Sequence, residues 1–251
     1  MTRPLLNPPC PNWKEDLPDP HAKPNNKKFT GRQTPNHIDT VYLEFPRSSS
    51  TWRGAVSLTL IPAFYLLLGA PRLIIDIIST RELTILPLAI VSYLFLTWLI
   101  LIGLRMDLCP PRDQPIRFNR IRQRVYAYNF IHCWWNPLGN WKVSHVSYEW
   151  SQARAERWLQ RVGSMTKQGV VLSIVDPRSN KVIDRFPLTC MGSDQYAWAY
   201  ICTYMQEGPS ALPPPGIPKD HNDVLWYEFA LRLAPKVMWP PEMDLESRTA
   251  P

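Results

Sequence analysis

The chain has 251 residues and a formal net charge of +7, from 28 Lys and Arg against 21 Asp and Glu. Its 10 Gly are scattered and form no phosphate-binding loop, which argues against the common nucleotide-binding folds. Two long apolar runs in its first half make a purely soluble domain the less favoured interpretation, although a pair of helices buried in a large soluble core remains the alternative.

The N-terminal segment, residues 1–37, is rich in Pro, Asn and Lys and poor in apolar residues. Such a composition buries too little apolar surface to offset the entropy of ordering, so we expect an extended or disordered tail. Residues 38–54 follow as a short strand and linker, because apolar and polar residues partly alternate from His37 to Phe45. No cleavable signal peptide is predicted, since the first apolar run begins only near Ala55.

Residues 55–104 are predicted to form a transmembrane hairpin with spans at about 55–78 and 83–104. The second run holds 22 residues without a formal charge. As a helix it would reach about 33 Å, enough to cross a hydrocarbon core of about 30 Å. The first run is less clean, because Arg72 and Asp76 interrupt it; four residues apart on a helix, they could pair near the interface.

Basic residues gather on the outer ends of both spans, which predicts that both termini are cytoplasmic. Two of these arginines precede the hairpin and six follow it within residues 105–124, whereas the bridge between the spans carries Arg72 and Arg81 offset by two acidic residues. We interpret the second block as a signal of topology and of attraction to anionic lipid, rather than of nucleic-acid binding. In that reducing compartment the five cysteines are expected to remain free.

After a proline-punctuated linker at 105–114, residues 115–210 are predicted to form a small β-rich domain with a C-terminal helix. Residues 116–130 and 170–188 each indicate a β-hairpin, and 141–150 indicates a strand. Residues 151–162 fit either a helix or irregular structure. From residue 193 the apolar period becomes helical, with Trp198, Ile201, Cys202 and Met205 on one face and Ser193 or Asp194 as N-cap.

The predicted fold class is therefore a membrane-anchored α+β protein, in which an amphipathic helix closes an open barrel or curved sheet. Residues 211–251 complete the chain as a Pro-rich linker, a short helix near 225–233 and a polar tail.

Two groups of residues are candidates for contact with a partner or with lipid. Arg117, Asn119 and Arg120 are expected to be exposed or to cap a turn, whereas Ile116 and Phe118 on the same strand would face the core. Trp134, Trp135 and Trp141 are the stronger candidates, because indole rings are enriched at binding hot spots. Their alternative role is simple packing or a position at the membrane boundary.

The sequence offers no convincing catalytic, cofactor or metal site. Ser164 and Lys167 fit a serine–lysine spacing, but the companion motifs of that chemistry are missing. The cysteines and histidines lack the spacing of a zinc site. We therefore predict a protein that is not an enzyme and needs no cofactor.

Several patches resemble an uncharacterised bacterial family with two transmembrane segments followed by a pleckstrin-homology-like domain, often encoded beside type VI secretion effectors. The resemblance covers residues from about 40 to 215. It is carried by Pro115–Arg120, Val125-Tyr126, Trp198–Ile201, Tyr204–Pro209 and Leu212-Pro213.

The resemblance implies an immunity protein in the bacterial inner membrane that neutralises a cognate toxin through its cytoplasmic domain. It supplies no catalytic residues. Two alternatives remain: a lipid-binding or scaffolding accessory protein, and a toxin that itself acts on membranes.

Overall fold

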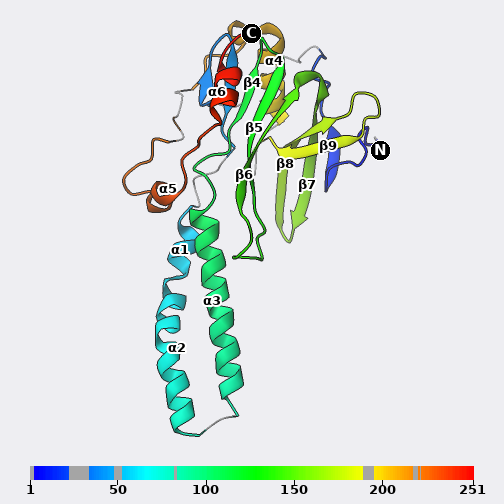
Figure 1. Ribbon diagram of the computed structural model, residues 1–251. Helices are drawn as coiled ribbons and strands as arrows, with labels where there is room; N and C mark the ends of the chain where they lie inside the picture. Colours follow the sequence, from blue (N-terminus) through cyan, green and yellow to red (C-terminus); the bar gives the residue numbers. More distant parts are fainter. Residues whose placement is uncertain are drawn as a thin grey trace.

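The computed structural model describes residues 3–22, 34–47, 53–81, 84–188, 195–216, 220 and 222–251. Two long helices project as a stalk from a β-rich body, and both chain ends lie in that body, away from the tip of the stalk (Figure 1). The α+β class with a helical hairpin is thus confirmed. The proposed N-cap residues Ser193 and Asp194, together with Leu83 at the start of the second predicted span, lie outside the described residues.

The first sheet has five antiparallel strands in the order β2-β3-β4-β5-β6. Its strands are β2 (His37–Ile38), β3 (Tyr42–Phe45), β4 (Ile116–Asn119), β5 (Arg124–Ile131) and β6 (Lys142–Glu149). The predicted hairpin at 116–130 and the strand at 141–150 are confirmed. The β4–β5 turn ends at Gln123, whose positive φ of 51° suits a tight connection.

The second sheet has the order β1-β7-β8-β9 and is also antiparallel. Its strands are β1 (Trp13–Asp16), β7 (Ala153–Val162), β8 (Met165–Val175) and β9 (Val182–Pro187). The β8–β9 hairpin turns at 176–180, as its Asp-Pro-Arg-Ser-Asn sequence predicts. Most of the ambiguous segment 151–162 is strand β7, because ten backbone pairs with β8 override its good helix propensity.

The N-terminal segment is not a disordered tail over its described residues 3–22. Strand β1 pairs with β7, and the side chains of Leu6 and Cys10 are buried. The amide of Cys10 donates a hydrogen bond of 2.9 Å to the carboxylate of Glu156, which is itself fully buried. Ordering therefore comes from an edge of the second sheet that composition alone does not reveal. Residues 23–33 of the predicted tail lie outside the described part of the chain.

The core lies between the two sheets and helix α4 (Gln195–Glu207). The predicted apolar face of this helix is buried, and the Trp198 ring lies 5.3 Å from that of Trp150. The helix stops at Gly208, where φ is 88° and the amide donates back to the carbonyl of Tyr204.

The stalk consists of α1 (Ala55–Thr59), α2 (Ile61–Ser79) and α3 (Leu86–Leu108). Helices α2 and α3 are long and apolar enough to cross a membrane. Every residue of α2 keeps part of its surface exposed, whereas the last turns of α3 are partly buried. The structure divides the first predicted span near Leu60 and extends the second helix beyond residue 104. Asp107 explains this extension, because its carboxylate accepts hydrogen bonds from both the amide and the hydroxyl of Ser57.

The stalk is an insertion within the first sheet. Strand β3 immediately precedes it and β4 immediately follows it, yet the two strands pair directly, with Phe45 opposite Ile116. Residues 38–45 therefore belong to the same sheet as the domain predicted at 115–210. Since neighbouring strands hold both ends of the insertion, the chain must enter and leave the stalk on the same side (Figure 1).

The C-terminal segment returns to the sheet instead of forming a polar tail. It contains α5 (Phe229–Leu233), shorter than the predicted helix, and α6 (Pro241–Arg248), which packs against β4. Pro241 at the first helical position and acidic residues in the first turn favour this helix start.

Candidate functional site

The outer face of the five-stranded sheet carries polar side chains beneath the C-terminal segment. Alternation along β4 sends Ile116 and Phe118 into the core, as predicted, and turns Arg117 and Asn119 outward. The paired strand β3 contributes Glu44 to the same outer face, directly opposite Arg117. These side chains, which point outward from the sheet, are nevertheless buried, because α6 and the segment before it cover this face.

Arg117 is the centre of the arrangement, with its side chain 1% exposed. Its Nε donates to Glu44 at 2.5 Å, and one terminal nitrogen donates to Asp244 at 2.7 Å and to the Ser247 hydroxyl at 2.8 Å. The guanidinium also lies 4.5 Å from the centre of the Trp239 ring. Charge-assisted hydrogen bonds and a cation–π contact thus compensate a buried cation that would otherwise be strongly unfavourable.

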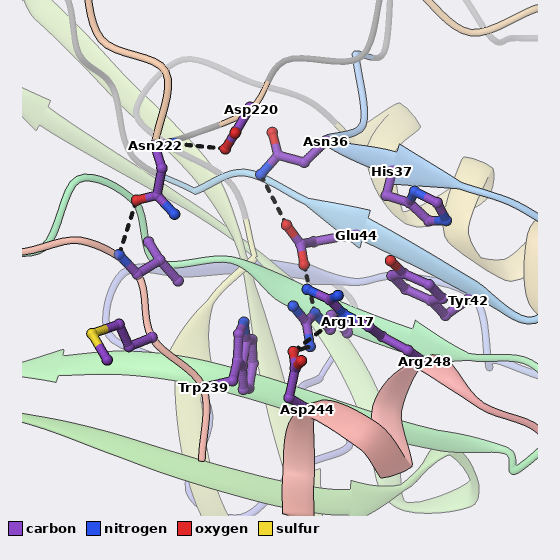
Figure 2. A pocket seen from close by; sticks show the side chains of 12 residues that line it. Asn36, His37, Tyr42, Glu44, Arg117, Asp220, Asn222, Trp239, Asp244 and Arg248 are labelled. Atoms are coloured by element: carbon purple, nitrogen blue, oxygen red, sulfur yellow. Dashed lines mark hydrogen bonds and ion pairs between the residues drawn. The ribbon is translucent and has the colours of Figure 1, made fainter. Parts of the chain in front are cut away.

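Arg117, Glu44, Asp244 and Trp239 line a polar cavity of about 670 Å³. Figure 2 shows Arg117 between Glu44 and Asp244, with Trp239 on one side and Tyr42 on the other. The remaining lining comes from segments far apart in the chain: Asn36, His37, Asp220, Asn222, Val237, Met238 and Arg248. A cavity with fixed donors, acceptors and an aromatic wall suits a small polar ligand or an inserted polar side chain.

A second set of contacts holds the end of the chain. Asn119 donates its amide hydrogens to the carbonyls of Ser247 and Thr249, at 3.1 and 3.0 Å. Glu246 accepts hydrogen bonds from Arg124 and from the Tyr126 hydroxyl. Burial, and then the hydrogen bond to Glu246, raise the pKa of Tyr126 to about 12, so the phenol remains a donor. We call residues 237–250 together with these partners the C-terminal clamp.

Arg117 and Asn119 are therefore buried, which corrects the expectation that they are exposed. The alternative, that they cap the turn, is confirmed for Asn119, whose Oδ1 accepts a hydrogen bond of 2.8 Å from the Arg122 amide. Both side chains also donate hydrogen bonds to the C-terminal segment, because this segment, predicted as a polar tail, covers their face of the sheet. Arg120, by contrast, is partly exposed in the turn; its amide donates to the carbonyl of Val41 and its guanidinium lies beside Gly208. A turn role for Arg120 is confirmed.

The predicted tryptophans lie apart from this cavity, in the loop between β5 and β6. Trp134 and Trp135 are exposed. Trp141 is partly covered, and the guanidinium of Arg105 from α3 stacks over its ring at 4.7 Å. The structure thus separates the six predicted residues into three places. Arg117 and Asn119 contact the C-terminal segment, Arg120 lies in the β4–β5 turn, and the three tryptophans lie in a loop at the root of the stalk.

Sequence reasoning missed Glu44, Trp239, Asp244 and Ser247, which complete the Arg117 site. The available signal was the Pro-Pro-Glu-Met-Asp sequence from residue 240, which is typical of a helix start. A short helix at this position needs a surface to pack on, and the polar outer face of β4 is that surface. Within the described part of the chain, no group of three or more His, Cys, Asp or Glu is arranged to hold a metal ion.

The DUF6708 family model, described as a family of unknown function, matches residues 93–251. The chain belongs to this family. The match begins within α3 and includes both sheets' later strands, α4 and the whole C-terminal clamp, so this DUF6708 protein shares with its family the segment that forms most of the cavity. No curated protein and no solved structure matches the chain.

The buried ion pair predicts a strong effect of Arg117→Met. The substitution leaves Glu44 buried without its cation, and we expect a loss of about 3–5 kcal/mol in the free energy of unfolding. Thermal or chemical unfolding of the purified protein in detergent measures it. Arg124→Ala is the matched control, because its ion pair with Glu246 is substantially exposed and should contribute less than about 1 kcal/mol. Equal stability losses in the two variants would contradict a central role for Arg117.

The environment of His145 predicts that the C-terminal clamp becomes less stable as the pH falls. Burial lowers the pKa of His145 below its ordinary value of 6.5, and its Nε2 has no hydrogen-bond partner among the described residues. The unfolded chain therefore takes up a proton at higher pH than the folded chain, and stability falls as the pH drops through 6.5. The ring contacts Trp239 and the backbone of Met238, so the loss should be felt in residues 237–250.

Hydrogen exchange of the 237–250 peptides at pH 7.5 and 5.5 tests this coupling. After correction for the intrinsic exchange rate, which is itself lower at pH 5.5, we expect lower protection factors at pH 5.5 than at pH 7.5 in the natural chain, and a smaller difference in His145→Phe, which has no proton to gain. An unchanged pH difference in that variant would assign the effect to other groups.

Proposed function

We propose that this DUF6708 protein is anchored in a membrane by the α2–α3 hairpin and presents its β-rich domain at one membrane surface. The observation that carries this proposal is the stalk itself: two long apolar helices that expose their side chains all along α2 and over most of α3. Water is a poor solvent for such a surface, whereas a hydrocarbon core of about 30 Å matches its length.

The insertion of the stalk between paired strands supports a topology with both ends of the chain on one side. The excess of arginine outside the spans favours the cytoplasmic side. Together with the bacterial resemblance, this supports our proposal that the protein lies in the inner membrane.

A pleckstrin-homology-like fold is our proposal for the β-rich body. Its support is the order of elements, in which two successive antiparallel sheets are followed by an amphipathic helix, α4, that packs into the core between them. The stalk would then be an insertion after the first main strand of that fold.

We further propose that the body binds a protein partner, the toxin of a type VI secretion effector pair, and acts as its immunity protein. The resemblance supplies the partner, and the polar cavity at Arg117 supplies a recessed surface with fixed donors and acceptors for it. Anionic lipid is the alternative partner. It has less support from the basic block, because Arg105, Arg112 and Arg117 direct their guanidinium groups to carbonyls and carboxylates of the protein itself.

The topology can be tested with reporter fusions in the full chain. A reporter inserted after Arg81, at the tip of the stalk, should be active on the outer side, and one fused after Pro251 on the cytoplasmic side. Activity of both fusions on the same side would refute the two-span arrangement.

Co-expression with the neighbouring toxin gene tests the immunity proposal. We expect the full chain to restore growth, and an equally expressed Arg117→Met chain to restore it less, since the cavity loses its cation. Continued toxicity despite confirmed membrane insertion would refute this function. Loss of membrane potential on expressing the chain alone would favour a membrane-acting toxin instead.

A further inference from the structure

Two exposed apolar segments flank the root of the stalk. One is the β5–β6 loop and the strand end before it; the other is the stretch that contains α5. We call them together the aromatic collar, which comprises Ile131, Trp134, Trp135 and Leu138 on one side and Leu225, Trp226, Tyr227, Phe229 and Leu233 on the other, all exposed. Figure 1 shows the β5–β6 loop beside α3 and the α5 segment beside α1.

The loop half of the collar is tied to the last turn of α3. Arg105 donates to the carbonyls of Pro137 and Gly139, the second at 3.2 Å, while its guanidinium covers Trp141. These bonds leave Leu138, between the two carbonyls, with 86% of its surface exposed. The loop is thus held in place with its apolar side chains directed away from the protein.

The other half is tied to the linker that follows α3. Arg112 donates to the carbonyls of Leu231, Asn222 and Arg232 at 2.7 to 3.1 Å. Ala230 and Leu231 of α5 are buried, whereas Trp226 is 81% exposed. The segment therefore packs with Ala230 and Leu231 inward and its aromatic residues outward.

This arrangement is unfavourable in water. Large apolar side chains that are gathered and held outward mark a surface that is covered in the working state. The position of the collar indicates what covers it. The collar lies beside the end of α3 at which the exposed apolar surface of the stalk ends, at Arg105, so the two apolar surfaces are continuous. From Leu86 to Arg105 the helix rises about 30 Å, so the bilayer surface would lie close to this arginine.

We infer that the aromatic collar inserts into the interfacial layer of the bilayer and fixes the depth and tilt of the β-rich body. Trp and Tyr favour this layer, because their rings are apolar and their N–H and O–H groups reach water or headgroups. The occupant is lipid, and no protein partner is required. The inference rests on the proposed membrane insertion of the stalk.

Peptide-resolved hydroxyl-radical footprinting of the full chain in phospholipid nanodiscs, one copy per disc, tests the collar and the stalk separately. Tyr65 and Phe95 are exposed reporters on α2 and α3, and Met238 and Leu245 are exposed reporters in the C-terminal segment. We expect oxidation of Trp134, Trp135 and Trp226 to be slowed at least about fivefold relative to the level set by their exposure, as for side chains at the acyl boundary. The C-terminal reporters should react freely.

Fast oxidation of the collar with protected Tyr65 and Phe95 would overturn this inference alone. Fast oxidation of Tyr65 and Phe95 as well would overturn the membrane insertion on which it rests.

A substitution provides the second measurement. Trp134→Asp/Trp135→Asp should leave the stalk reporters protected and speed the oxidation of Leu138 and Trp141, because two carboxylates withdraw the loop from lipid. Leu245→Asp is the matched control on α6 and should leave the collar rates unchanged. Unaltered protection of Leu138 in the double variant would show that something other than lipid covers the loop.

Discussion

The buried contact of Arg117 with Glu44 and Asp244 is the interaction on which the arrangement of the body depends. It joins three parts of the chain: β3 before the stalk, β4 after it and α6 near the C-terminus. Removing a cation from a site that has lost its water leaves at least one carboxylate without compensation. The same contact thus joins the two strands that flank the inserted stalk and positions one wall of the polar cavity.

Arginine plays a similar role at the root of the stalk, for a reason set by composition. Proline has no amide hydrogen, so segments rich in its 27 copies have more carbonyl acceptors than donors. Guanidinium groups, with five N–H donors each, correct this imbalance. Arg47 donates to the carbonyls of Gln114, Pro187 and Tyr128, and Arg53 to those of Pro110 and Pro111. The two arginines that precede the stalk are therefore part of the fold.

The sequence predicted the elements well where one local period governed them. Alternation identified β4 and β5, and a helical period identified the buried face of α4. It failed where distant segments decide the environment. Arg117 lies on a strand with an ordinary alternating pattern, and its burial depends on residues 237–250, more than a hundred positions away. The N-terminal strand β1 is likewise stabilised by its pairing with β7, which its own composition does not indicate.

The connections of the stalk and the cavity are linked by hydrogen bonds, which gives the insertion a consequence beyond location. Asn36 donates its side-chain amide both to Asp113, in the linker after α3, and to Glu44, in the Arg117 site. Asp113 in turn accepts the backbone amide of Arg47 at 3.0 Å, where the chain leaves β3. Both connections of the stalk to the body therefore meet the hydrogen-bond network that orients Glu44. The hydrogen bonds of Asn36 and Asp113 therefore couple the connections of the stalk to the geometry of the cavity.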